Sequence, residues 1–171
     1  MADLVRPDDK RLSARRTSKQ RGPRVEYLAF RLAGDTYAVP IGEVREILRF
    51  PLVTEVPRAP REVLGVVSVR GLLVTVIDLR QRLRIAGGEP SRRGRILLVT
   101  GAEEEVIGLY VDEVLQVYRL AESEIEIAAN VLAGKVADYV VGIGRPQGTL
   151  LILLDLGPIV GRAEPGAGDA T

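Results

Sequence analysis

The chain has 171 residues, of which 46% are hydrophobic, enough to form the core of one domain or of two small subdomains. It contains no Cys and no His, which excludes disulfides, thiolate nucleophiles and every catalytic or metal site that depends on histidine. No apolar run approaches the roughly 20 residues needed to cross a bilayer, and residues 1–11 lack the apolar stretch of a secretory signal. The sequence therefore predicts a cytoplasmic protein that does not insert into the membrane.

Residues 1–24 form a basic leader. They hold eight basic and three acidic residues, a net charge of +5, whereas the whole chain carries +1 and the remainder therefore −4. The leader shows no apolar periodicity, so we expect it to be disordered. Clustered Arg and Lys attract phosphates, which makes nucleic acid or an anionic membrane the alternative to a simple solubilising role. The leader has neither an aromatic residue for base stacking nor the apolar face of a membrane-lying helix.

Short strands separated by turns follow the leader. Leu28, Phe30 and Leu32 recur at every second position, which is typical of a half-buried strand, and the turn 33–36 leads into a second strand through Tyr37 and Val39. Many short strands joined by Gly-containing turns favour an all-β barrel or sandwich. Residues 44–48 are expected to form more strand or a short turn of helix. Further strands are expected at Val63–Val69, Leu72–Ile77, Ile96–Val99, Val106–Val111, Val114–Tyr118, Tyr139–Ile143 and Thr149–Leu154. Residues 162–171 are small and Gly-rich, and we expect a frayed tail.

Acidic residues stand at two kinds of position, directly after predicted strands and in a predicted turn. Asp78 and Asp155 each follow a strand, and we expect them to cap short helices, at 78–84 and from 155, rather than to form a pair for acid–base catalysis. The three consecutive acids at 103–105 sit in a predicted turn and point in different directions, so a solvated turn is favoured over a cation site. No catalytic, cofactor-binding or metal-binding residue is predicted.

An internal repeat links the two halves of the chain. VLGVVSVRGLLVTVIDL (Val63–Leu79) aligns with VVGIGRPQGTLLILLDL (Val140–Leu156), and both segments share their glycine spacing and a closing Asp-Leu. The turns at Gly34 and Gly101 give a fainter match. Two copies of one β unit indicate two similar subdomains, with each repeated glycine at a bulge, a tight turn or a close backbone approach.

The ordered set of motifs resembles the CheW-like family of chemotaxis coupling proteins. The similar segments are YLAFRLAGDTYAVPIGEVREI (27–47), VLGVVSVRGLLVTVIDLRQRL (63–83), VIGLYVDEVLQV (106–117) and YVVGIGRPQGTLLILLDL (139–156). The resemblance covers residues 25–161. It implies two intertwined five-stranded, SH3-like β-barrels with short helices.

The resemblance also implies a function without chemistry. Such proteins are adaptors that connect the cytoplasmic tip of a chemoreceptor to the regulatory domain of a chemotaxis histidine kinase, and no small-molecule substrate is expected. The family positions linked to partner contacts fall on Val44, Glu46, Gly65, Arg70, Gly71 and Val117. The alternatives are a divergent relative that does not activate a kinase and an adaptor whose basic leader binds nucleic acid.

The chain departs from the family pattern at several positions. Ser68 and Val69 replace the usual Asn-Leu before the Arg-Gly turn, Pro40 stands in place of an Asp, and Thr75 in place of a Pro. The segment 87–95 is unusually rich in Arg. These changes leave the fold prediction intact but make it unsafe to identify the receptor by analogy.

Two of the implied contact positions also have physical interpretations. The fork of Arg70 could hold a carboxylate on a partner, or it could cap a turn and lie over the barrel. Val44 and Glu46 would share one face of a strand, either at the rim of an interface or on an edge whose charge blocks unwanted pairing.

Apolar and basic segments raise two further expectations. The strands 72–77 and 150–154 are apolar at nearly every position, and we expect both to be buried within the molecule, with contact to the kinase as the alternative. A group of arginines is expected to lie exposed around a loop, with an anionic partner as the alternative. It comprises Arg80, Arg82, Arg84, Arg92, Arg93 and Arg95.

Overall fold

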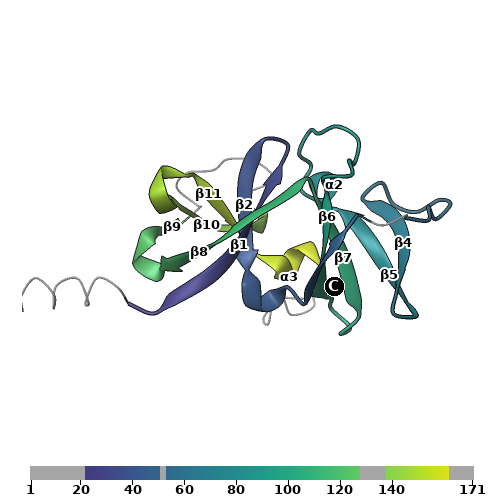
Figure 1. Cartoon of the computed structure of the whole chain (residues 1–171), viewed down its shortest axis with the longest axis horizontal. Coiled ribbons are helices and arrows are strands. Elements are labelled where there is room, and N and C mark those ends of the chain that lie inside the picture. Colours follow the sequence, from purple (N-terminus) through teal and green to yellow (C-terminus); the bar gives the residue numbers. More distant parts are fainter. Residues whose placement is uncertain (1–21, 51–52, 128–137, 162–171) are drawn as a thin grey trace, which may run out of the picture.

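A computed structural model describes residues 22–50, 53–127 and 138–161, which form two β-barrels along the long axis of the molecule (Figure 1). The strands are β1 (Arg24–Leu32), β2 (Asp35–Pro40), β3 (Glu46–Arg49), β4 (Val63–Val69), β5 (Leu72–Asp78), β6 (Arg95–Thr100), β7 (Val106–Val111), β8 (Glu113–Ala121), β9 (Ile125–Ile127), β10 (Val140–Gly144) and β11 (Leu151–Leu154). The short helices are α2 (Leu79–Arg82) and α3 (Leu156–Ile159), with 3-10 turns at Ile41–Glu43, Glu122–Glu124 and Pro146–Gly148. The first 21 residues of the predicted leader and the whole predicted tail, 162–171, lie outside the described residues.

The two barrels are intertwined, as predicted. Barrel A has the strand order β8-β1-β2-β11-β10-β9, and barrel B has the order β3-β6-β7-β5-β4. Barrel B comes from one continuous stretch of chain, which is inserted between β2 and β8, so both ends of the described chain belong to barrel A. Barrel A has six strands instead of the predicted five because it includes β9, which pairs with β10. In barrel B the corresponding place is taken by a single bridge between Thr54 and Val66.

The hydrogen-bonding pattern confirms the internal repeat. Each barrel contains one parallel strand pair, β5 with β7 in barrel B and β11 with β2 in barrel A. Thr75 in the first pair and Ile152 in the second are 77 residues apart, the same offset that relates the two repeated sequences. The antiparallel hairpins β4–β5 and β10–β11 both carry a register shift near their start.

Repeated glycines stand at these register shifts. Gly65 has a φ of +150°, and a Cβ added to it would lie 2.1 Å from the carbonyl oxygen of Thr54. A Cβ added to Gly142 would lie 2.6 Å from the carbonyl oxygen of Glu126. Neither distance is compatible with a side chain, so a bulge crossed by a neighbouring backbone explains both glycines.

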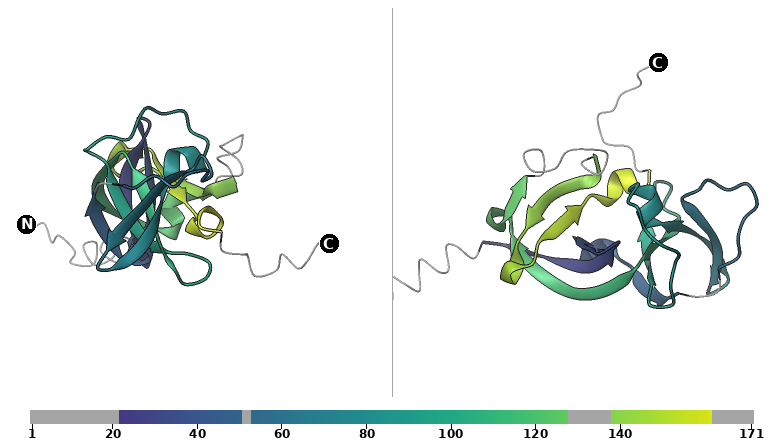
Figure 2. Two further views of the ribbon diagram at one scale, coloured as in Figure 1. Left: turned by 90° about the vertical axis from the view of Figure 1, so that its right-hand side faces the viewer. Right: turned by 90° about the horizontal axis from the view of Figure 1, so that it is seen from above.

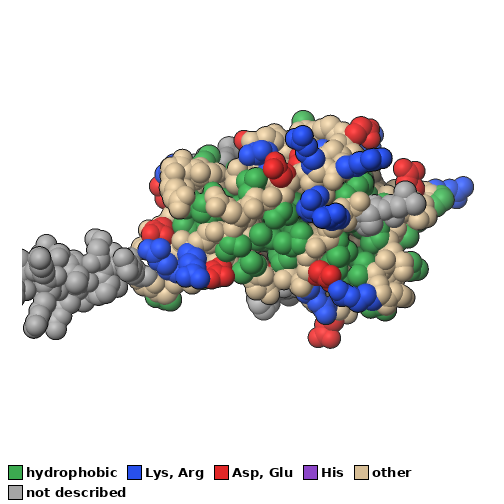
Figure 3. All heavy atoms as spheres, viewed as in Figure 1, with side chains coloured by type: hydrophobic (Ala, Val, Ile, Leu, Met, Phe, Trp, Pro, Cys, Tyr) green, Lys and Arg blue, Asp and Glu red, His purple; other side chains and the backbone are tan. Residues whose placement is uncertain are grey.

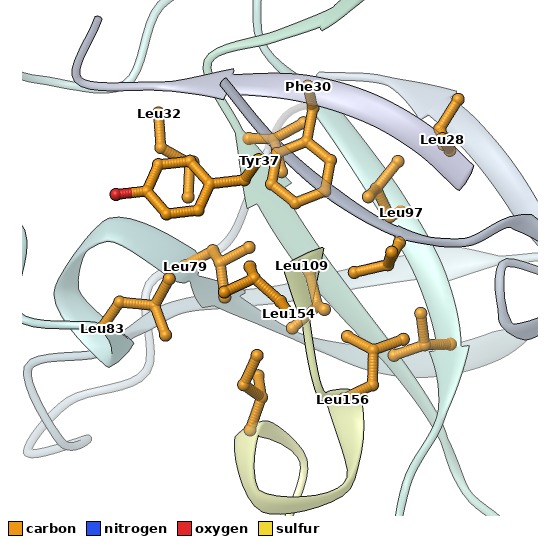
Figure 4. Packing of buried hydrophobic residues seen from close by; sticks show 14 of the residues in the cluster. Leu28, Phe30, Leu32, Tyr37, Leu79, Leu83, Leu97, Leu109, Leu154 and Leu156 are labelled. Carbon is orange, nitrogen blue, oxygen red and sulfur yellow. The ribbon is translucent and has the colours of Figure 1, made fainter. Parts of the chain in front are cut away.

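A shared hydrophobic core joins the barrels (Figure 4). Phe30 and Tyr37 of barrel A stack with ring centroids 6.4 Å apart, and they belong to the same cluster as Leu97 and Leu109 of barrel B. Helix α3 lies where the barrels meet, as Figure 2 shows, and buries Leu156 and Ile159 in this cluster. Each fully buried side chain of this size contributes about 1.5–3 kcal/mol, so the core holds the barrels in a fixed relation.

Strand β11 is buried on both faces, as its composition predicts. Ile152 and Leu154 point into the shared core, whereas Leu151 and Leu153 belong to the separate core of barrel A. Leu150, just before the strand, is exposed.

Aspartates cap both short helices, which confirms the capping prediction. An Asp78 Oδ1 accepts a hydrogen bond from the backbone N–H of Arg80 at 3.1 Å, and Asp155 Oδ1 accepts one from Gly157 at 3.0 Å. These bonds satisfy backbone donors that a helix start leaves free. Helix α2 ends at Arg82, two residues before the predicted end.

The expectation of an exposed arginine group holds for Arg84, Arg92 and Arg93, is met only in part by Arg82 and Arg95, and was wrong for Arg80. Its guanidinium is buried and forms ion pairs with Asp78 at 3.1 Å and with Asp112 at 3.2 Å. It also lies over the ring of Tyr110, 5.3 Å from the centroid. Burial lowers the pKa of Arg80, but the hydrogen bond and the charges of the two aspartates raise it by more, so its pKa lies above the ordinary value.

Asp112 extends this buried cluster from one barrel to the other. Its second oxygen, Oδ2, accepts a hydrogen bond of 2.7 Å from the backbone N–H of Ala33, in the β1–β2 turn. Asp112 thus connects α2 of the barrel B segment to a hairpin of barrel A. We refer to Asp78, Arg80, Tyr110 and Asp112 as the buried arginine cluster.

Candidate partner-binding surface

The β4–β5 turn presents Arg70 and Gly71 at one tip of barrel B. Val69 and Leu72 form the last pair of the hairpin, so the turn contains only these two residues. Both have a positive φ, +50° for Arg70 and +81° for Gly71, which is the requirement of a type I′ turn. No atom lies within 4 Å of a Cβ added to Gly71, so the glycine is there for its backbone conformation and not for space.

Arg70 forms an ion pair with Glu46, the first residue of β3. The distance between Arg70 Nη2 and Glu46 Oε1 is 2.7 Å, and 76% of the Arg70 side chain is exposed. An exposed pair of this kind contributes only about 0.2–1 kcal/mol, so a partner can replace Glu46 at little cost. The structure therefore brings together two predicted contact residues that lie 24 positions apart in the sequence. A groove of about 230 Å³ runs beside them, between Arg45, Val69 and Leu72.

Leu72 and Leu73 are exposed, which contradicts the prediction that their strand is buried on both faces. Leu72 is 64% and Leu73 is 77% exposed. Of the β5 side chains, Val74 and Val76 belong to the core of barrel B, whereas Leu72 and Leu73, at the start of the strand, are left exposed by the described residues. The two exposed leucines follow Arg70 and Gly71 directly in the chain, and exposed apolar side chains of this kind are typical of surfaces that bind other proteins.

Val44 and Gly65, the other predicted contact positions in this part of the chain, have structural roles. Val44 ends the 3-10 turn Ile41–Glu43, is half-buried and packs against the shared core. It precedes β3, which begins at Glu46, so the two residues do not share one strand as expected. Gly65 is buried beneath Thr54, where it holds the bulge of β4.

Barrel A presents a related surface. Gln147 and Gly148 form the turn before β11, with φ values of +53° and +80°, nearly the values of the Arg70–Gly71 turn. Val117 of β8 is 42% exposed, and a groove of about 470 Å³ is lined by Val117, Arg145 and Gln147. Each barrel thus carries a turn with two successive residues of positive φ beside a groove, with Gln147 in the place of Arg70.

The described residues contain no group of three or more His, Cys, Asp or Glu side chains placed to hold a metal ion. The acidic turn 103–105 is exposed, and Glu105 uses its side chain to accept a hydrogen bond of 2.7 Å from the backbone of Glu103. This contact and the exposure match the predicted solvated turn. In the described part of the chain no helix is long and apolar enough to span a membrane.

The most informative residues missed at the sequence level are Arg80 and Asp112. The signal Asp-Leu-Arg at 78–80 indicates a helix cap and nothing more. Asp112 follows a strand without any motif, and only the packing of α2 against β7 brings it to Arg80.

Two small barrels that share one core and each present an exposed turn define a double-barrel protein whose surface is suited to contacting other proteins. The chain belongs to the CheW-like domain family, whose model matches residues 26–164. It is 30% identical over 139 residues to "Chemotaxis protein CheW" of Klebsiella aerogenes, covering 81% of this chain and 83% of that protein. It is also 30% identical over 133 residues to the protein of the same name from Bacillus subtilis, covering 78% and 85%.

A solved structure supports the same assignment. The scaffolding protein TtCheW from Thermoanaerobacter tengcongensis superposes with a TM-score of 0.71 and 29% sequence identity. The match covers 78% of this chain and 90% of that chain. The double-barrel fold and the family resemblance are therefore confirmed.

Proposed function

We propose that the chain is a non-catalytic adaptor that couples chemoreceptors to a chemotaxis histidine kinase in a bacterial signalling pathway. The observation that carries the proposal is the pair of related turns, Arg70–Gly71 and Gln147–Gly148, on two barrels held together by one core. An adaptor needs two contact surfaces in a fixed relation, and this arrangement supplies them. The relatives named as chemotaxis proteins and the solved scaffolding protein support the same function.

We assign the first contact to the barrel B surface around Glu46, Arg70 and Gly71, with Leu72 and Leu73 as its apolar part. Only one Arg70 nitrogen is engaged by Glu46, so the remaining guanidinium donors are available for a partner's carboxylate. Val44 and Gly65 act by holding β3 and the bulge of β4 in place. Their effect on partner binding is therefore indirect.

We assign the second contact to barrel A, around Val117. The partners are the regulatory domain of the kinase and the cytoplasmic tip of the receptor, and the complex forms in the cytoplasm. A signal passes if the kinase makes different contacts with the adaptor in its active and inactive states, because only differential contacts shift a conformational equilibrium.

The test is a titration of the full chain against the kinase regulatory domain and a receptor-tip fragment. Arg70→Ala is expected to weaken binding to one of them by about tenfold, because the loss of an interface arginine costs about 1–2 kcal/mol of binding free energy. Arg31→Ala is the matched control, because Arg31 forms an exposed ion pair of 3.1 Å with Glu113 on barrel A. The double variant Arg70→Glu/Glu46→Arg retains an internal ion pair, so a loss of binding there identifies a contact role rather than a structural one.

Val117→Asp extends the test to barrel A. We expect it to weaken binding to the other partner and to leave the Arg70-dependent partner unaffected. A well-folded protein that binds neither partner refutes the adaptor function. Equal weakening of both partners by each variant refutes the division into two surfaces.

A further inference from the structure

Four arginines lie on the segments that meet where β3 ends and β6 begins in barrel B. Arg49 is the last residue of β3 and pairs directly with Arg95, the first residue of β6. Arg92 and Arg93 precede β6 in the loop from α2. Figure 3 shows several Lys and Arg side chains, with Asp and Glu side chains among them, over this upper part of the molecule. We refer to Arg49, Arg92, Arg93 and Arg95 as the arginine edge.

The turn that carries Arg92 and Arg93 is anchored firmly to the barrel. The backbone N–H of Ser91 donates to the hydroxyl of Tyr110 at 2.8 Å, and the N–H of Gly94 donates to the carbonyl of Ser91 at 3.0 Å. A Cβ added to Gly94 would lie 2.2 Å from the Tyr110 ring, so the chain passes directly over this buried side chain. Both ends of the turn are therefore fixed, and Arg92 and Arg93 are exposed between them.

Arg95 stabilises the same turn through hydrogen bonds from its side chain. Its Nη1 donates to the carbonyl of Gly94 at 2.8 Å and to that of Arg93 at 3.1 Å. A guanidinium that caps carbonyl groups in this way keeps its positive charge in the cluster. The arginine edge is thus pre-organised, which lowers the conformational entropy that binding would remove.

In the part of the chain that the structure describes, the arginines of the arginine edge differ from many others in forming no ion pair, although the exposed Glu89 lies in the same loop. Arginines elsewhere in the described residues form ion pairs with carboxylates, among them Arg24, Arg31, Arg119 and Arg145. Within the described ranges no carboxylate forms an ion pair with any of the four arginines at the edge. Arg49 and Arg95 are moreover direct cross-strand neighbours, and like charges in that position destabilise a sheet. An anionic ligand would relieve this repulsion.

The surroundings select the class of ligand. Strand β3 is at the edge of its sheet, and such an edge can receive an extended peptide. The neighbouring aromatic side chains, Phe50 and Tyr110, pack against each other with ring centroids 5.2 Å apart, so neither is free to stack on a nucleic-acid base. We propose that the arginine edge binds an acidic polypeptide segment through its carboxylates. Arg49 and Glu46 stand at opposite ends of β3, so the arginine edge shares no residue with the Arg70 contact, and the proposal does not depend on the coupling function.

The test uses the full chain and a fluorescent poly-glutamate peptide as the probe. Arg92→Gln/Arg93→Gln is expected to weaken binding by about tenfold, at about 0.5–1 kcal/mol for each exposed charge. Arg58→Gln/Arg61→Gln is the matched control. Both residues are exposed in the connection between β3 and β4, and the two substitutions remove the same charge as Arg92→Gln/Arg93→Gln. In the unaltered chain, amide NMR signals of residues 91–95 should shift on titration, which distinguishes this surface from the basic leader.

The outcomes are decisive in either direction. Selective loss in the Arg92/Arg93 variant, with shifts at 91–95, supports the proposal. Equal loss in both double variants, or no shift at 91–95, overturns it because the binding is then a general charge effect. Duplex DNA or anionic vesicles that bind more tightly than the peptide, with the same dependence on Arg92 and Arg93, overturn the assignment to a polypeptide. Coupling of receptor to kinase is measured separately and should be unaffected by the Arg92/Arg93 variant.

Discussion

Replacing the buried Arg80 by Met should destabilise the protein strongly. The Arg80 guanidinium is 5% exposed and faces Asp78, whose side chain is 4% exposed, at 3.1 Å. Without the cation, Asp78 remains as a buried carboxylate with no charged partner. Breaking a buried ion pair from one side costs about 3–5 kcal/mol. The midpoint of thermal unfolding should fall by about 10 °C for a chain of this size.

Urea unfolding followed by circular dichroism measures this effect directly. Arg80→Met/Asp78→Asn should recover a substantial part of the loss, because Asn removes the buried charge and still accepts the helix-cap hydrogen bond. Arg119→Met is the control. Arg119 forms a 3.0 Å ion pair with Glu26, but its side chain is 70% exposed, so the change should cost less than about 1 kcal/mol.

Two results would refute this reasoning. A loss below about 1 kcal/mol in Arg80→Met would show that the cluster contributes no more than a surface ion pair. A double variant that is less stable than Arg80→Met would show that the unpaired charge of Asp78 is not the cause.

Two further predictions follow from single residues. Gly65→Ala should destabilise the protein by more than about 3 kcal/mol, because the new Cβ would lie 2.1 Å from a backbone oxygen. Gly34→Ala, at φ +92° with no atom within 4 Å of the new Cβ, should cost only about 1 kcal/mol. Equal losses of unfolding free energy in urea would contradict the close-approach explanation. Burial, and secondly the charge of Asp35, raise the pKa of Tyr37. The neutral phenol therefore contributes stability that is fully present below about pH 10 and is lost as the pH rises above that value, because the unfolded state ionises first. Tyr37→Phe should make the unfolding free energy fall less steeply above pH ~10, and an unchanged slope would contradict this assignment.

The candidate surface could be predicted only in part from the sequence. The family motifs identified Arg70, Gly71 and Glu46, but not that Arg70 and Glu46 are in contact. That contact depends on the closure of barrel B, which brings the start of β3 to the tip of the β4–β5 hairpin. The arginine edge was visible only as an Arg-rich loop, since the pairing of Arg49 with Arg95 is a property of strand register.

Burial was the property that composition predicted least well. Strands β5 and β11 are both apolar at nearly every position, yet β11 is buried on both faces while Leu72 and Leu73 are exposed. The difference lies in what packs over each strand: β11 stands between the core of barrel A and the shared core. Nothing in the local sequence distinguishes the two cases. The three-residue strand β9 was missed for a related reason, because so short a segment becomes a strand only by pairing with β10.

The sequence by itself determined the strands other than β9, the helix caps, the two-fold repeat and the glycine positions of the bulges and turns. These features depend on side-chain alternation, on local hydrogen bonds and on the backbone conformations that only glycine adopts easily. The tertiary structure alone decided the exposure of Leu72 and Leu73, the burial of Arg80 between two aspartates and the meeting of Arg70 with Glu46. Each of these depends on residues far apart in the chain, which become neighbours only when the two barrels close and pack together.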